Sequence, residues 1–159
     1  MNKRTLRLPA LDPGEITIVA GSNYPGDFKS RVAGRSKQKL GEALGLRNFG
    51  VNLTTIKPGA ASALRHWHAK QDEFVYIVSG ELVLVTSGGE QLLTAGTCAG
   101  FPAGNADGHH LVNRSAADAT YLEVGDRTPD DAVTYPDDDI AARAIDGVWK
   151  FFRKNREPY

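Results

Sequence analysis

The sequence has a single cysteine, Cys98, among 159 residues. One cysteine cannot form an intrachain disulfide, and we expect a reducing, cytoplasmic location. No histidine flanks Cys98 in the sequence, so we interpret it as a small buried hydrophobic residue and not as a nucleophile.

An excess of charge of either sign is also missing. Lysine and arginine total 19, aspartate and glutamate total 19, and the formal net charge is zero. A chain without a positive excess does not look built to neutralise phosphates, so we expect no nucleic-acid partner. No uninterrupted apolar run approaches the length of a membrane span, and residues 1–11 lack the apolar segment of a secretory signal. We therefore expect neither a membrane span nor a signal peptide.

Glycine, in contrast, is abundant, with 17 residues in a chain that is 41% hydrophobic. So many glycines suit tight turns, and short apolar runs separated by turn signals predict an all-β sandwich or barrel. The length is that of one domain with a substantial core.

The four histidines of the chain fall in two short places, which is its strongest functional signal. His66 and His68 are two residues apart, and on a strand both would point to the same face. Glu73 follows a short polar run that is expected to form a turn, and the strand that begins at Glu73 would run back beside the two histidines. Two imidazoles and a carboxylate form a plausible partial shell for a divalent metal. The other histidines, His109 and His110, would point to opposite faces of a regular strand, so only one of them could complete the shell.

These residues lie in two motifs that resemble the two signatures of the cupin superfamily. The first is Gly59 followed by His66-x-His68-x4-Glu73-x6-Gly80, and the second is Gly96-x5-Pro102-x-Gly104 followed by His109-x3-Asn113. Four residues, 105–108, separate the last glycine from the histidine, where the cupin pattern usually has two. The resemblance covers roughly residues 48–125.

The cupin resemblance implies a fold and a ligand set. The fold is an antiparallel double-stranded β-helix, or jelly-roll barrel, that holds a divalent metal with His66, His68, Glu73 and His109. The spacing to Asn113 favours His109 over His110 as the fourth ligand. We expect one cupin domain over residues 1–159, in which a barrel at about 48–125 is wrapped by an N-terminal arm, 1–47, and a C-terminal extension, 126–159. The resemblance also favours a homodimer.

The flanking segments carry weaker signals. Ser36–Leu46 shows helical spacing of apolar residues after a possible N-cap and is predicted to form a short helix. Residues 126–139 carry six aspartates and are interpreted as a solvated connection. Residues 140–145 are expected to form one or two helical turns. The apolar segment Trp149–Phe152 either closes its own barrel or contacts a second copy.

Three histidines and one glutamate would leave one or two positions open on a six-coordinate metal. Such a site can polarise a carbonyl or acidify a bound water. Zinc, iron, manganese and nickel all fit the ligand set. We therefore expect a metal-dependent enzyme of isomerase, lyase or dioxygenase type that acts on a small oxygen-rich metabolite, with Glu73 as the catalytic residue that takes a proton. The alternative is a cupin that binds or senses a small molecule without turnover.

Strand parity also predicts the lining of the ligand pocket. It nominates Asn52 or Thr54, together with Val75, Ile77 and Leu111. This lining is largely apolar, and only Arg65, which we expect in a surface ion pair, adjoins the histidine motif. We therefore expect a small carboxylate, keto or enol ligand in preference to a polyphosphorylated sugar.

Overall fold

The computed structural model describes residues 6–159, and strands dominate them. The helices are short: two 3-10 helices at Pro13–Glu15 and Gly26–Val32, and α1 at Leu40–Ala43. The strands are β1 (Ile18–Ala20), β2 (Arg35–Gln38), β3 (Phe49–Ile56), β4 (Trp67–His68), β5 (Glu73–Ser79), β6 (Glu81–Thr86), β7 (Gly89–Thr94), β8 (Cys98–Phe101), β9 (His110–Val112), β10 (Ala119–Asp126), β11 (Ala132–Thr134), β12 (Ala141–Ile145) and β13 (Val148–Phe152). Among the described residues, no helix has the length and apolar character that a membrane crossing requires.

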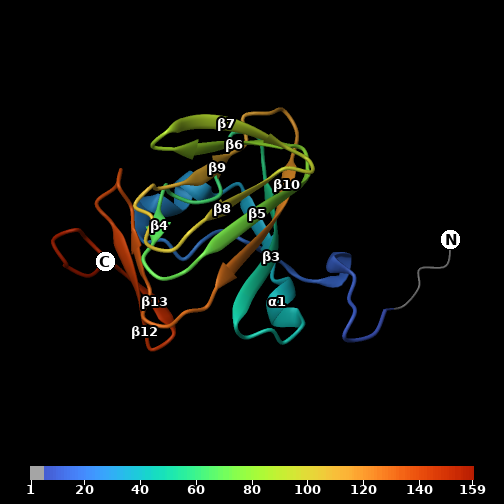
Figure 1. Ribbon diagram of the computed structural model, residues 1–159, viewed down its shortest axis with the longest axis horizontal. Coiled ribbons are helices and arrows are strands. Elements are labelled where there is room, and N and C mark those ends of the chain that lie inside the picture. The colour runs from blue at the N-terminus through green and yellow to red at the C-terminus, as the bar shows by residue number, and fades with distance from the viewer. Residues whose placement is uncertain (1–5) are drawn as a thin grey trace.

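The strands form three antiparallel sheets (Figure 1). A six-stranded sheet has the order β1-β2-β3-β10-β5-β8, a four-stranded sheet the order β13-β12-β11-β4, and a three-stranded sheet the order β7-β6-β9. The antiparallel all-β barrel predicted from the sequence is confirmed, including its short helix.

The first hydrophobic cluster lies between the six-stranded and the three-stranded sheets. Ile56, Ile77 and Leu82 are fully buried at its centre. On β5, buried Val75 and Ile77 alternate with exposed residues, because successive side chains of a strand point to opposite faces. Burial of these aliphatic side chains holds the two sheets together.

A second hydrophobic cluster joins both chain flanks to the four-stranded sheet. It contains Tyr24 and Val32 from the N-terminal side and Val133 and Ile140 from the C-terminal side. Trp149 and Phe151 pack against this cluster, so the apolar C-terminal segment covers its own chain. The N-terminal and C-terminal flanks therefore pack into one shared core, and neither forms a core of its own.

The helix predicted for Ser36–Leu46 is wrong over its first half. Residues Arg35–Gln38 form β2, which pairs with both β1 and β3, and only Leu40–Ala43 is helical. The backbone hydrogen bonds to two neighbouring strands outweigh the weak helical spacing of the apolar residues.

Two expectations for the C-terminal extension are also wrong. The segment 126–139 is not simply a solvated connection, because it contains β11 and the buried side chains of Asp131 and Tyr135. Residues 141–145 form β12 between β11 and β13, where a helical turn was expected. Pairing on both sides and the burial of Ala142 override the helix propensity of the alanines.

Ile140 tests whether the C-terminal extension belongs to one cooperative domain, as the sequence leads us to expect. Its side chain is fully buried in the second cluster. Ile140→Ala is expected to lower the free energy of unfolding by about 2–5 kcal/mol, because it removes buried methyl groups and leaves a cavity. Urea denaturation followed by circular dichroism measures this change.

The matched control is Ile18→Ala, whose side chain is 64% exposed. This exposed site is expected to change the unfolding free energy by about 0.5 kcal/mol or less. Equal, small effects of both substitutions would show that the extension unfolds separately from the barrel.

Candidate metal centre and its cavity

A backbone bridge between His66 and His109 brings the two histidine segments together. The amide of His66 donates to the carbonyl of His109 at 3.1 Å, and the amide of His109 donates to the carbonyl of His66 at 2.8 Å. His109 precedes β9 of the three-stranded sheet, and His66 precedes β4 of the four-stranded sheet. Glu73 opens β5 in the six-stranded sheet. The site therefore lies where the three sheets meet.

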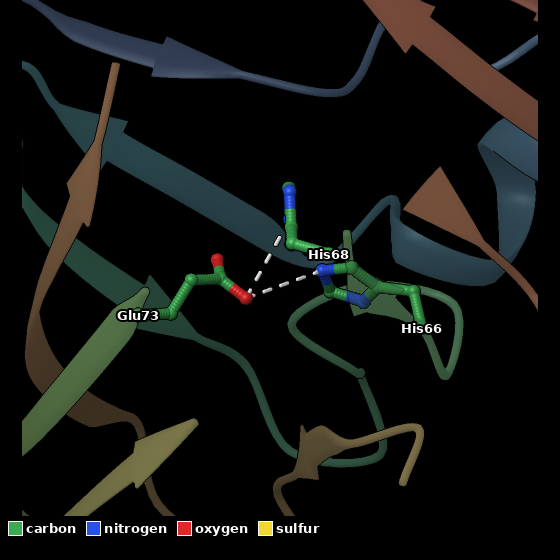
Figure 2. A group of neighbouring side chains, drawn as sticks. All are labelled: His66, His68 and Glu73. Atoms are coloured by element: carbon green, nitrogen blue, oxygen red, sulfur yellow. Dashed lines mark ion pairs between the residues drawn. The ribbon is translucent and has the colours of Figure 1, made fainter. Parts of the chain in front are cut away.

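Three imidazoles converge on one oxygen of Glu73. The Nε2 atoms of His66, His68 and His109 lie 3.7, 3.6 and 3.0 Å from its Oε2. Figure 2 shows the contacts of His66 and His68 with this oxygen, while the other carboxylate oxygen points away from them. The ligand atoms of His66, His68 and Glu73 all lie within 4.8 Å of one another. This set of nitrogen and oxygen donors fits a divalent transition metal.

Hydrogen bonds of their Nδ1 atoms orient His66 and His68 toward this centre. The Nδ1 atom of His66 lies 2.8 Å from the carbonyl oxygen of Leu64, which can only accept, so Nδ1 carries the proton. The Nδ1 atom of His68 lies 2.6 Å from Oδ2 of Asp131. Both arrangements leave the Nε2 lone pair facing Glu73, as metal-ligating histidines require.

Asp131 is a site residue that sequence reasoning missed. Its side chain is fully buried, and its second oxygen accepts from the amide of Lys70 at 2.7 Å. It lies in the aspartate-rich segment interpreted as solvated. Nothing in the sequence distinguishes it from the neighbouring exposed Asp130, because its partner His68 is 63 residues away.

His66 and Glu73 have, at neutral pH, the protonation states that a metal needs. Burial lowers the pKa of His66 to about 4, so its imidazole is neutral. Burial alone would raise the pKa of Glu73, but the hydrogen bond from His109 and the electrostatic effect of the three imidazoles outweigh it and lower this pKa to about 2. A neutral imidazole and an ionised carboxylate bind a cation without first losing a proton.

The structure places His109, and not His110, beside Glu73. The ring of His109 stacks on Phe101, with 3.5 Å between the ring centroids, and its Nδ1 is buried without a partner. His110 instead places its Nδ1 3.0 Å from the carbonyl oxygen of Ala63. The ligand role of His109 stays a prediction, but its position agrees with the one the sequence favoured.

Two other residues named from the sequence are placed by the structure. Arg65 forms the expected ion pair, with Nε and one terminal nitrogen each 2.7 Å from an oxygen of Asp137. Cys98 is exposed, so the interpretation of it as a buried hydrophobic residue is wrong. It opens β8 opposite Tyr76 of β5, and both side chains lie on the outer face of the sheet.

Two cavities, of about 370 and 310 Å³, adjoin the histidine cluster, and both are lined by His68, Glu73 and His109. Of the nominated residues, Asn52, Val75 and Leu111 line the larger cavity. Thr54 and Ile77 are fully buried and belong to the core.

The prediction of a largely apolar lining is wrong. The larger cavity is also lined by charged and polar side chains, among them Arg35, Lys37, Gln71 and Glu123. Parity within the strands around the motif predicts the apolar residues of the lining, whereas the charged residues come from β2 and β10.

A half-buried polar network forms part of this lining. Lys37 pairs with Oε1 of Glu123, which also accepts from the amide of Asn52 at 2.8 Å. The hydroxyl of Tyr121 donates to Oε2 of Glu123 at 2.9 Å. Burial alone would raise the pKa of Glu123, but Lys37 and the hydrogen bonds lower it, so this carboxylate is ionised and neutralises Lys37.

The chain resembles known proteins over most of its length. A family model described as the cupin domain matches residues 52–125. A sugar phosphate isomerase from a cupin superfamily, from Silicibacter pomeroyi, is 46% identical and superposes with a TM-score of 0.91, covering 95% of this chain and 96% of that one.

Two further solved structures extend this comparison. A protein of Acidithiobacillus ferrooxidans, named as a candidate sugar phosphate isomerase, is 30% identical with a TM-score of 0.71, covering 79% of this chain and 80% of that one. The polyketide cyclase RemF of Streptomyces resistomycificus shares the fold alone, at 16% identity and a TM-score of 0.61, covering 74% of this chain and 78% of that one. No curated protein matches the chain.

The metal centre predicts a clear effect of ligand removal. The His66→Ala, His68→Ala double variant is expected to lose stoichiometric metal while the barrel stays folded, because two of the four donors are gone and the hydrophobic clusters are untouched. Metal content after purification without added metal, measured by mass spectrometry, is the readout, with circular dichroism as the check on folding.

Substitutions of His109 and His110 form a matched pair that tests which of the two residues is the fourth ligand. His109→Ala is expected to lose metal, whereas His110→Ala is expected to keep it. Full metal occupancy in the double variant would refute the site, and the reverse result for the pair would assign the fourth position to His110.

Proposed function

The chain belongs to the cupin superfamily, and from this premise we propose that it is a metal-dependent isomerase acting on a small sugar-type hydroxy-carbonyl compound. The convergence of three imidazoles on one carboxylate beside a polar cavity carries the proposal. Its similarity over almost the whole chain to a protein named sugar phosphate isomerase supports the reaction class. Within the expected class of small oxygen-rich metabolites, we therefore propose a sugar or a sugar phosphate as the substrate.

The residues proposed to hold the metal are His66, His68, Glu73 and His109. A divalent metal bound there would supply a Lewis acid that polarises the carbonyl of the substrate. Zinc, iron, manganese and nickel are all compatible with these donors. The hydrogen bonds of the Nδ1 atoms of His66 and His68 keep their rings oriented while the substrate enters.

Glu73 is proposed to move the proton. Isomerisation requires that a proton leave the hydroxyl-bearing carbon next to the carbonyl and return to the former carbonyl carbon. The carboxylate takes this proton, the C–H electron pair forms the carbon–carbon double bond, and the π pair of the carbonyl moves onto its oxygen to give an enediolate. A proton then passes from the neighbouring hydroxyl to this oxygen, and Glu73 returns its proton to the former carbonyl carbon. The isomer forms with no oxidant or reductant consumed. Glu73 lines both cavities, so its carboxylate can reach a substrate as a base.

The polar network opposite the metal centre is proposed to bind the substrate hydroxyls. Lys37, Asn52 and Tyr121 surround Glu123 on the inward face of the six-stranded sheet. Hydroxyl groups can exchange hydrogen bonds with these donors and acceptors, whereas an apolar lining would leave them unsatisfied.

Proton exchange with solvent tests the activity. Metal-loaded protein in deuterated water is expected to interconvert aldose and ketose forms of a sugar or sugar phosphate and to place deuterium at the carbon next to the carbonyl, as proton NMR would show. Glu73→Gln is expected to lower kcat by about 10²–10⁴-fold, the usual contribution of an acid–base group. Because Glu73 is also a proposed ligand, metal content is measured in the same samples.

A matched carboxylate variant and the binding alternative complete this experiment. Glu123→Gln is expected to raise KM more than it lowers kcat, because its role is assigned to binding. If metal-loaded protein binds sugars but neither isomerises them nor exchanges deuterium, the chain is the non-catalytic binding cupin and the isomerase proposal fails.

We also propose a homodimer that forms through the outer face of the six-stranded sheet. Phe74, Tyr76 and Val78 of β5 are 41–49% exposed there, and Leu122 and Val124 of β10 lie opposite Tyr76 and Phe74 in register. These side chains form one apolar stripe across two strands, and a second copy would remove it from water. A net charge of zero opposes this self-association only weakly.

Light scattering during gel filtration tests the dimer. The wild-type chain is expected to elute at twice its mass of 17.2 kDa. Tyr76→Glu is expected to elute as a monomer, because a charge in the middle of the stripe would have to be buried. Leu92→Glu on β7, a similarly exposed apolar position outside the stripe, is expected to remain dimeric. A wild-type monomer at all concentrations would contradict the proposal.

A further inference from the structure

Arg35 is a cation inside the larger cavity that no carboxylate neutralises. It lies on β2 opposite Ile56, and it shares the inward face of the strand with Lys37 two residues later. Lys37 has Glu123 as its partner, but within residues 6–159 no carboxylate oxygen lies within 4.0 Å of the guanidinium of Arg35. The charge of Arg35 is therefore uncompensated within the described chain.

The hydrogen bonds of Arg35 hold its guanidinium in place without satisfying it. One terminal nitrogen donates to the carbonyl of Ser62, and the other donates to the carbonyl of Gly21 at 3.2 Å. The Nε atom is buried and has no hydrogen-bond partner. Arg35 as a whole is half-buried, and buried N–H groups such as its Nε are almost always paired. Two neutral carbonyls fix the guanidinium but do not cancel its charge.

The neighbouring phenols do not supply the missing negative charge. Tyr24, Tyr121 and Tyr135 are close enough to Arg35 for its charge to lower their pKa values, yet burial raises all three pKa values above the ordinary value for tyrosine. All three side chains are therefore neutral at physiological pH. Tyr135 also stacks on His66, with 5.8 Å between the ring centroids, so the surroundings of Arg35 extend to the metal centre.

We propose that Arg35 is the subsite for a phosphate group of the substrate. This inference extends the proposed isomerase function and rests on it for the identity of the sugar part of the ligand. The planar guanidinium donates to the oxygens of a phosphate as well as balancing its charge.

Arg35 adds a positive charge to the cavity that an ion pair within the described chain does not balance, because the partner of Lys37 is Glu123. An anionic group of the substrate would balance this charge. A phosphate monoester carries close to two negative charges at neutral pH, whereas a carboxylate carries one, so a phosphate is attracted more strongly by this cation. The proposed sugar phosphate substrate supplies such a group.

Titration of inorganic phosphate into the protein, followed by calorimetry, tests the subsite. Arg35→Gln is expected to weaken phosphate binding by about 10- to 100-fold, the usual effect of losing a charged hydrogen-bonding partner. The matched control is Arg31→Gln, which removes an arginine paired with Asp138 on the surface and is expected to leave phosphate binding unchanged. Arg35→Lys keeps the charge, is expected to weaken binding less, and serves as the test if Arg35→Gln does not fold.

Two further arms separate phosphate at Arg35 from phosphate at the metal. In protein treated with a chelator, phosphate binding is expected to persist and still to depend on Arg35. Binding that disappears with the metal and is equal in the wild type and Arg35→Gln would overturn the proposal. Acetate binding that depends on Arg35, without phosphate binding, would overturn the assignment to phosphate.

The subsite and the isomerase can fail separately. Phosphate binding that depends on Arg35 in a protein without turnover would support the subsite and contradict the isomerase. Isomerisation of sugar phosphates with the same KM in the wild type and Arg35→Gln would support the isomerase and overturn the subsite.

Discussion

The reciprocal backbone hydrogen bonds between His66 and His109 are the constraint on which the candidate site depends. They join the edge of the four-stranded sheet to the edge of the three-stranded sheet, and they fix which side chains face Glu73. Because side chains alternate along a strand, a slip of one residue in this pairing would turn His109 away and bring His110 inward. The choice between the two histidines is therefore made by backbone register and not by any difference in their chemistry. Both cavities are lined by His68, Glu73 and His109 of this cluster.

The second hydrophobic cluster supports the site from behind. It holds β11 against β4, and this pairing places the fully buried Asp131 beside His68. The flanks that pack around the barrel thus supply part of the environment of the histidines. A chain limited to residues 48–125 would contain the histidines and Glu73 but would lack Asp131, and also β2 with Arg35 and Lys37. In this protein part of the surroundings of the proposed ligands, namely Asp131, Arg35 and Lys37, comes from outside the region that carries the motif.

The sequence predicted the local part of this arrangement and not the distant part. His66, His68 and Glu73 lie within eight residues, so strand parity and one turn were enough to bring them together. The barrel strands could be recognised for the same reason, because β3, β5 and β6 show regular apolar patterns between turn signals. Asp131 and Glu123 reach the site through pairings between strands far apart in the chain, and periodicity within one segment carries no information on such pairings. The alanines of β12 point to a helix by propensity alone, and only the neighbouring strands decide otherwise.

The misinterpreted strand β2 and the misjudged cavity have one physical cause. A half-buried strand is recognised by apolar residues on its inward face, but the inward residues of β2 are Arg35 and Lys37. With charged residues in those positions the alternation disappears, and the segment shows only the weak helical spacing that continues into α1. Placing these two charges on the inward face costs free energy. The charge of Lys37 is balanced by Glu123, whereas Arg35 donates hydrogen bonds only to backbone carbonyls. Departures from local consistency concentrate where a protein binds something else. The position at which the sequence pattern fails is thus the position at which the cavity carries an uncompensated charge, and stability of the fold alone gives no reason for that charge.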